Sequence, residues 1–324
     1  MEKKWTWIFA LLAALLGATP IVGMYLFPGL NNFFLHVATY MCIMIILTLG
    51  LHIFFGLCGQ INFGANGFYA AGGYIATLLI IRLHLHFFIA LPLAVIGTGI
   101  LTLILGFALL RLRHWVLALG TTAFGFAVYL TLRTVAVTVL GGDDGLFVPR
   151  LVIFGTKAGP YFFYYFILAW TILCLLGAYF FEKSRAGRAL QAIREEEVTA
   201  LVVGINVDHY IRVAFVLSGM YSGLAGALYA QWNRGVAPEN FSLDIAMLVL
   251  VFVVVGGLGK LSGVVIGTAI MLLLPELLTF LREYQLLIYA LIFFLVIRFF
   301  SEGIVGAIQT SMERRKAARQ NPVD

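Results

Sequence analysis

The chain runs for 77 consecutive residues, from Trp5 to Ile81, without a single Asp, Glu, Lys or Arg. Charged residues make up 11% of its 324 residues and hydrophobic residues make up 62%, whereas soluble domains are about 25% charged. A soluble fold of this composition could not cover its surface with polar groups. We therefore predict an all-α integral membrane protein. No Pro-, Gly- or Ser-rich linker interrupts the chain, which favours a single transmembrane domain over residues 1–324.

A helix rises about 1.5 Å per residue, so roughly 20 apolar residues cross the hydrocarbon core. On this scale the sequence predicts a polytopic bundle of about ten transmembrane spans, at 6–27, 33–55, 63–81, 87–110, 115–139, 161–181, 209–231, 244–258, 261–279 and 284–301. The third span is weak because glycine and amide residues surround its start, and the eighth is short. If both weak segments are re-entrant, the bundle has eight spans.

The distribution of basic residues indicates the orientation, because Lys and Arg concentrate in cytoplasmic loops. With ten alternating spans and an inside start, 15 basic residues fall on the inner side and 6 on the outer side. Both termini are therefore predicted to be cytoplasmic, including a basic C-terminal tail at about 302–324.

Charged residues are concentrated in one internal segment, at about 182–208, which we call the charged island. Eight of the first sixteen residues of this island are ionisable. Leu190, Ile193 and Leu201 fall near one face of a helix predicted over Arg188 to Val203, and Gly204 then allows the chain to turn. A short amphipathic helix of this kind can dock in a groove of a soluble protein. A solvated, charge-rich loop is the simpler alternative.

A second segment, from Gly56 to Gly67, places four glycines and three amide side chains between two apolar runs. Polar groups at membrane depth are costly unless they are buried in protein or line water. A broken helix at a transport pathway fits this composition, with four candidate pathway residues: Gly59, Gln60, Asn62 and Asn66. A tight turn at the inner surface is the alternative.

The longest outer loop contains five residues that could contact a partner delivering the cargo: Gly141, Gly142, Asp143, Asp144 and Gly145. A plain surface turn is the alternative, and the acidic groups are too few for a calcium site. No metal site is predicted, because the spacing of Cys42, Cys58 and Cys174 fits no metal motif. The run around Gly259-Lys260 fails the phosphate-loop pattern, with Val254 and Leu261 at two required positions. No constellation of catalytic residues is present, so an enzyme is not expected.

Several runs carry a resemblance to a known family. The run from Gly187 to Glu197, GRALQAIREEE, is followed by Ala200 and then by the run from Gly204 to Val207, GINV. Supporting motifs are Gly59-Gln60, Ala214–Ser218, Gly223–Ala230, Gly141-Gly142-x-x-Gly145-Leu146, Pro238-Glu239-x-Phe241-Ser242 and Gly256–Gly259. Together these runs resemble the LivM-type branched-chain amino acid ABC transporter permease family, over about residues 47–306. The chain departs from the family pattern at Phe126 and Leu201, where acidic residues are frequent.

This resemblance implies a multi-pass permease subunit of an ATP-driven importer in the inner (cytoplasmic) membrane of a bacterial cell. The implied partners are two soluble ABC ATPases, a second permease subunit that is LivH-like or identical, and a periplasmic substrate-binding protein, with membrane lipid around the bundle and no nucleic acid. ATP and Mg²⁺ would be bound by the partner ATPase, and this chain would bind no cofactor. The residues implied in ATPase coupling are Gly187, Arg188, Arg194, Glu195, Glu196, Glu197, Ala200 and Gly204.

The cargo stays open at this point. Branched-chain amino acids (Leu, Ile and Val) are the first expectation, and urea, short amides or other amino acids are alternatives within the same family. An ion-coupled secondary transporter is the alternative from another class, but such proteins usually carry ionisable groups inside their spans. This chain has almost none there.

Overall fold

The computed structural model describes residues 31–112, 115–135, 137–153 and 156–277, together with positions 287, 291 and 294. Three predicted features therefore lie outside the described residues: the first span at 6–27, nearly all of the last span at 284–301, and the C-terminal tail at 302–324. The predicted location of both termini falls there as well.

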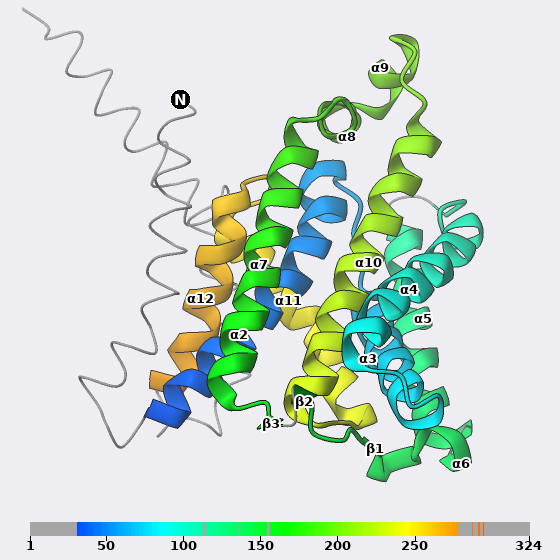
Figure 1. Ribbon diagram of the computed structural model, residues 1–324. Coiled ribbons are helices and arrows are strands. Elements are labelled where there is room, and N and C mark those ends of the chain that lie inside the picture. The colour runs from blue at the N-terminus through cyan, green and yellow to red at the C-terminus, as the bar shows by residue number, and fades with distance from the viewer. Residues whose placement is uncertain are drawn as a thin grey trace, which may run out of the picture.

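The described chain is a bundle of helices joined by short connections (Figure 1). Its helices are α2 (Asn31–Leu51), η1 (His52–Gly56), α3 (Ala65–Arg82), α4 (Phe87–Leu109), α5 (Trp115–Leu130), η2 (Thr131–Val135), α6 (Val137–Leu140), η3 (Gly142–Asp144), α7 (Pro160–Lys183), α8 (Arg185–Glu195), α9 (Glu197–Val202), α10 (Val207–Asn233), η4 (Pro238–Phe241), α11 (Leu243–Gly256) and α12 (Leu261–Leu277). The four strands have two residues each. β1 (Leu146–Phe147) pairs antiparallel with β4 (Gly235–Val236), and β2 (Val152–Ile153) pairs antiparallel with β3 (Thr156–Lys157).

Six helical segments of the described residues are long and apolar enough to cross a membrane: Asn32–Gly56, Phe87–Leu109, Trp115–Thr134, Pro160–Lys183, Val207–Asn233 and Pro238–Gly256. They match the second, fourth, fifth, sixth, seventh and eighth predicted spans. The eighth reaches spanning length only because η4 precedes α11. The chain is thus an all-α membrane protein, with six candidate spans in the described part against ten predicted for the whole.

The third predicted span forms α3, which is helical but not among the six candidates. Eleven of its 18 residues are buried, because it lies inside the bundle against α10 and α4. The ninth predicted span forms α12, whose described residues end at Leu277, so the full length of this helix lies outside the described part of the chain. α3 departs from the simple length rule because neighbouring helices rather than lipid surround much of its surface.

The centre of the bundle is formed by α2 and α10. In the most apolar 18-residue stretch of α2 with η1, 89% of the residues are buried. The corresponding share is 28% for the span that begins with α5 and 33% for α4. The backbones of α3 and α10 meet at Gly72 and Gly223, where an added Cβ on Gly72 would overlap the Gly223 backbone. Small residues allow this approach, which maximises packing between helices in lipid.

The two ends of the bundle carry different structures. Figure 1 shows α8 and α9 together at one end and α6, β1, β2 and β3 at the other. The charged island and the glycine-rich loop at Gly141 are therefore on opposite ends, as the predicted topology requires.

Candidate coupling site at one end of the bundle

The charged island folds into α8 and α9, which connect α7 to α10. Ser184 caps α8, because its hydroxyl oxygen accepts a hydrogen bond of 3.2 Å from the backbone N–H of Gly187. Gly187 itself sits against the carbonyl groups of Phe181 and Glu182, where an added Cβ would overlap them. This close approach lets the chain turn sharply from α7 into α8.

The island helix differs from its prediction in two respects. It begins at Arg185, three residues early, and it breaks at Glu196, whose backbone is extended (φ −157°, ψ 109°) between α8 and α9. Leu190, Ile193 and Ala200 are buried against the bundle, whereas Leu201 is 50% exposed. The prediction that Leu201 shares one helix face with Leu190 and Ile193 was therefore wrong, because the extended residue Glu196 resets the helical phase between α8 and α9.

The end of α9 is closed as predicted at Gly204. The Gly204 N–H donates to the carbonyl of Leu201 at 3.0 Å, and the Ile205 N–H donates to the carbonyl of Ala200 at 3.0 Å. With Gly204 at φ +84°, this pair of bonds is the Schellman pattern of helix termination. The connection from α9 to α10 is thus defined by backbone hydrogen bonds.

The surface of α9 carries an exposed apolar patch, which we call the α9 patch. Its members are Val198, Leu201, Val202 and Val203, which are 66%, 50%, 81% and 69% exposed. Glu195 and Glu196 are exposed beside it. Exposed apolar surface rimmed by polar groups marks an interaction site. All four residues are absent from the predicted coupling set, although apolar residues inside a charged island were a visible signal.

Arg194 is an exposed residue of α8, and its side chain contacts two other segments of the chain. Its Nη1 donates a hydrogen bond of 2.5 Å to the carbonyl oxygen of Gly56, at the end of η1. An added Cβ on Gly59 would lie 3.0 Å from Cγ of Arg194, and one on Gly259 would overlap its Nη1. Both glycines have positive φ, +77° and +78°, so the two turns need glycine for their backbone as well as for space.

The segment from Gly59 to Gly64 is the predicted break between helices, and it is non-helical. Its backbone N–H groups are satisfied locally: Gly59 donates to the carbonyl of Phe55 at 3.0 Å, and Gly64 donates to Oδ1 of Asn62 at 2.8 Å. Phe63 donates to the hydroxyl of Thr121 on α5 at 3.1 Å. The broken backbone is therefore held inside protein, which is the condition for irregular structure at membrane depth.

The amide side chains of this segment are buried: Gln60 is 7% exposed, and Asn62 and Asn66 are each 1% exposed. Asn66 joins three elements, because its Nδ2 donates to the carbonyl of Phe241 in η4 at 3.1 Å and lies 3.5 Å from the carbonyl of Gly125 in α5. Among the described residues, Nδ2 of Asn62 and Oδ1 of Asn66 have no hydrogen-bond partner. The four predicted pathway residues thus line one continuous stretch that runs from Arg194 to the interior of the bundle.

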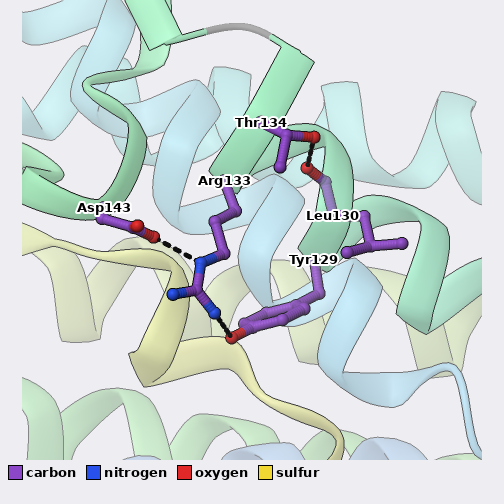
Figure 2. Close-up of polar contacts among 5 residues, drawn as sticks. All are labelled: Tyr129, Leu130, Arg133, Thr134 and Asp143. Atoms are coloured by element: carbon purple, nitrogen blue, oxygen red, sulfur yellow. Dashed lines mark hydrogen bonds and ion pairs between the residues drawn. The ribbon is translucent and has the colours of Figure 1, made fainter.

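The loop predicted to contact a delivering partner lies at the other end. Figure 2 shows the guanidinium of Arg133 between two partners: Nε is 2.7 Å from Oδ1 of Asp143, and Nη1 donates to the hydroxyl of Tyr129 at 3.2 Å. The side chains of the ion pair are 44% and 61% exposed, so it orders the loop but adds little stability. Gly142 to Asp144 form η3, and Gly145 packs against the carbonyl of Val236.

Within the described parts of the chain, no group of three or more His, Cys, Asp or Glu side chains could hold a metal ion. The glycine turn Gly257-Leu258-Gly259, which fails the phosphate-loop pattern in sequence, has a structural role as the contact of Arg194. Gly56 and Gly259 were not predicted as site residues. A signal was available in the sequence, since each of these glycines lies at the end of an apolar run. The sequence does not indicate that the side chain of Arg194 packs against them.

Comparison with known proteins shows the family of the chain. The profile of the family described as "Branched-chain amino acid transport system / permease component" matches residues 33–297. The chain is 32% identical over 276 residues to the permease protein LivM of the high-affinity branched-chain amino acid transport system of Salmonella typhimurium, covering 78% of this chain and 65% of that protein. It is 29% identical over 307 residues to LivM of Escherichia coli, covering 87% and 72%.

A second kind of permease is also related. The chain is 26% identical over 246 residues to the permease protein LivH of Salmonella typhimurium, covering 70% of this chain and 78% of that protein. No solved structure matches the chain. The chain spans slightly less than two thirds of the Salmonella LivM. The family match over most of the chain nevertheless establishes that this protein belongs to the family of permease components of branched-chain amino acid transport systems.

Proposed function

We propose that this chain is a membrane-spanning permease subunit of an ATP-driven importer of branched-chain amino acids, and that α8 and α9 are its contact with a separate ATPase. The observation that carries this proposal is the α9 patch, an apolar surface at the end of the bundle beside exposed glutamates. An apolar helix face in water fits a hydrophobic groove on another protein. The names of the related permeases supply the cargo.

The proposed coupling runs through Arg194. When the ATPase changes conformation, α8 and α9 move with it. The hydrogen bond from Arg194 to Gly56 passes this movement to the end of η1. From there it reaches the Gly59–Gly64 segment and Asn66, which contacts both α5 and η4. A charge-assisted hydrogen bond suits this task because it is roughly twice as strong as a neutral one.

The proposed topology has ten spans, with both termini and the island on the cytoplasmic side of a bacterial inner membrane. Two observations support it. The island and the Gly141 loop lie at opposite ends of the bundle (Figure 1), and the distribution of Lys and Arg over the predicted loops favours the island side as the inside.

The Gly141 loop would then face the periplasm, where a substrate-binding protein delivers the cargo. The chain would pair with a second permease subunit, LivH-like or identical, and the cargo would pass between the two. The buried amides of Asn62 and Asn66 support a role for the broken segment along this route, because buried polar atoms without protein partners are expected near water or cargo. ATP and Mg²⁺ would bind to two soluble ATPases, which perform the hydrolysis, and this chain would be no enzyme.

A charge placed in the α9 patch tests the proposal. Val202→Asp changes a side chain that is 81% exposed, so the bundle should fold normally. We expect the amount of protein in the membrane to be unchanged, while co-purification of the ATPase and leucine uptake both fall at least about tenfold, since a buried unpaired charge at an interface is strongly unfavourable.

The matched control is Val152→Asp, at the other end of the bundle, where the side chain is 46% exposed. This variant should keep the ATPase bound. Retention of the ATPase and of uptake by Val202→Asp would remove the support for α9 as the contact.

A further inference from the structure

A cavity of about 430 Å³ opens at the island end of the bundle, between the end of α4 and the start of α10. Of its lining residues, Gln60 belongs to the candidate transport pathway, and the others have no role in the proposed transport or in the proposed ATPase contact. Its lining combines charged, amide and apolar groups: Arg111, Asp208 and Arg212, then Gln60, then Phe107, Leu110, Leu117 and Ile211. Gln60, Leu117 and Ile211 are buried, whereas Arg111 and Asp208 are exposed. The charged groups therefore form the mouth, and apolar side chains with one amide form the floor.

Arg212 is held in place at this mouth. Its guanidinium carbon lies 4.7 Å from the centre of the Phe107 ring, within the range of a cation–π contact. Arg111, at the end of α4, provides a second guanidinium on the same cavity. Asp208 contributes one opposing carboxylate, so the three charged side chains leave a net positive mouth. Guanidinium groups are well suited to phosphate oxygens, because their planar array of donors matches the geometry of the anion.

An exposed apolar stripe on α4 leads to the same cavity. Four side chains at spacings of three and four residues are 52–62% exposed: Ile96, Ile100, Ile104 and Phe107. This spacing places them on one helix face. Phe107 belongs to both features, since it ends the stripe and lines the cavity. The cavity thus lies where an apolar surface along a spanning helix meets two cations. A phospholipid is complementary to this arrangement, because it joins an anionic phosphate to apolar acyl chains.

We propose that this cavity binds the phosphodiester headgroup of a membrane phospholipid. Arg111 and Arg212 contact the phosphate, the Gln60 amide lies below it, and the acyl chains follow the exposed face of α4. Basic pockets between spanning helices bind phospholipid headgroups in other membrane proteins, and each cation near the bilayer surface adds to the affinity. The bound lipid would fill the space between α4 and α10 next to the Gly59–Gly64 segment.

Native mass spectrometry of the full-length chain in detergent, after removal of lipid, tests the proposal by titration with phosphatidylglycerol. The double variant Arg111→Gln/Arg212→Gln should bind about thirtyfold more weakly than the wild type, and Asp208→Asn should bind about fivefold more tightly. These shifts have opposite signs, so general damage to the fold cannot produce both. The pair Arg111→Lys/Arg212→Lys keeps both charges but loses the planar donor array, so its affinity should fall between those of the wild type and the Gln double variant.

The matched control is Arg82→Gln/Arg150→Gln, which removes the same charge from exposed arginines at the end of α3 and between β1 and β2 and should leave the affinity unchanged. A galactosyl diacylglycerol, which has acyl chains but no phosphate, should not compete with phosphatidylglycerol. Equal affinity of the wild type and the Gln double variant would overturn the proposal. Competition by inorganic phosphate at the same concentration as the lipid would also overturn it, because the cavity would then be a general anion site.

Discussion

The Nη1 atom of Arg194 lies 2.5 Å from the carbonyl oxygen of Gly56, a residue 138 positions earlier in the chain. This hydrogen bond connects α8, at the end of the bundle, with the point where the central helix α2–η1 stops and the broken segment begins. Because the last carbonyl groups of a helix carry partial negative charge, a guanidinium is a fitting partner. The contact makes Arg194 a positioning residue between the island and the interior, and four predictions follow from this geometry and its surroundings.

Arg194→Ala should uncouple the permease without releasing the ATPase. Losing a hydrogen bond to a charged group costs about 1.5–3 kcal/mol, so leucine uptake by the reconstituted complex should fall about tenfold or more. The ATPase should still co-purify, since the α9 patch is intact. Arg185→Ala removes an exposed arginine from the same helix and serves as the control. Simultaneous loss of ATPase binding and uptake in Arg194→Ala would show that Arg194 acts in docking instead.

Gly259→Ala should destabilise the turn that receives Arg194. An L-residue at φ +78° is strained by about 1–2 kcal/mol, and the new methyl group would overlap Nη1 of Arg194. Thermal unfolding in detergent should therefore begin at a lower temperature. Combining Gly259→Ala with Arg194→Ala should cost less than the sum of the two changes, because the overlap disappears.

The matched control for this change is Gly159→Ala. Gly159 has a negative φ of −86° and no atom within 4 Å of an added Cβ. Its substitution should shift stability by no more than about 0.5 kcal/mol. Exact additivity of Gly259→Ala and Arg194→Ala would contradict the contact between these two residues.

Gly204→Asp should leave the protein in the membrane and abolish ATP-driven uptake. No atom lies within 4 Å of an added Cβ at Gly204, so the bundle can accommodate the side chain. The new charge would stand next to the α9 patch, where a partner must exclude water. The control is Gly204→Asn, because Asn adopts a positive φ as readily as Asp but adds no charge. This variant should keep measurable uptake. Normal uptake by Gly204→Asp in reconstituted vesicles would count decisively against the proposed coupling.

Asn66→Ala should lower stability, because it removes the donor to the carbonyl of Phe241 inside the bundle. A buried acceptor left without a partner costs about 1–3 kcal/mol, which thermal unfolding in detergent would detect. Asn233→Ala is the control, since its Nδ2 also donates to a carbonyl, that of Gly235, but at an exposed position. An equal loss of stability in both variants would mean that burial of Asn66 has no influence.

Much of the architecture could be read from the sequence. Apolar run length located the helices α2, α4, α5, α7 and α10, since a segment in lipid must satisfy its own backbone hydrogen bonds. The same rule failed for α3. Glycine and amide residues lower the hydropathy of α3, while its neighbours in the bundle cover it. Local pattern also located the island and the turn at Gly204, because helix termination depends on residues adjacent in sequence.

The site was harder to predict than the helices. The sequence indicated Arg194 as a coupling residue but not the direction of its side chain. It indicated the broken segment at Gly59–Asn66 but not the contacts with Thr121, Gly125 and Phe241 that hold it in place. The α9 patch was missed because a single extended residue, Glu196, changes which apolar side chains face the bundle.

Composition and local pattern by themselves determined that this protein lies in a membrane, where most of its helices run, and which loop is charged. Transfer of residues to lipid and helix capping are local effects, so the amino-acid order is sufficient for them. Only the tertiary structure decided that Arg194 meets Gly56, Gly59 and Gly259, and that α9 exposes an apolar surface. These relationships depend on how helices that are distant in the chain pack together. Sequence periodicity does not predict such packing.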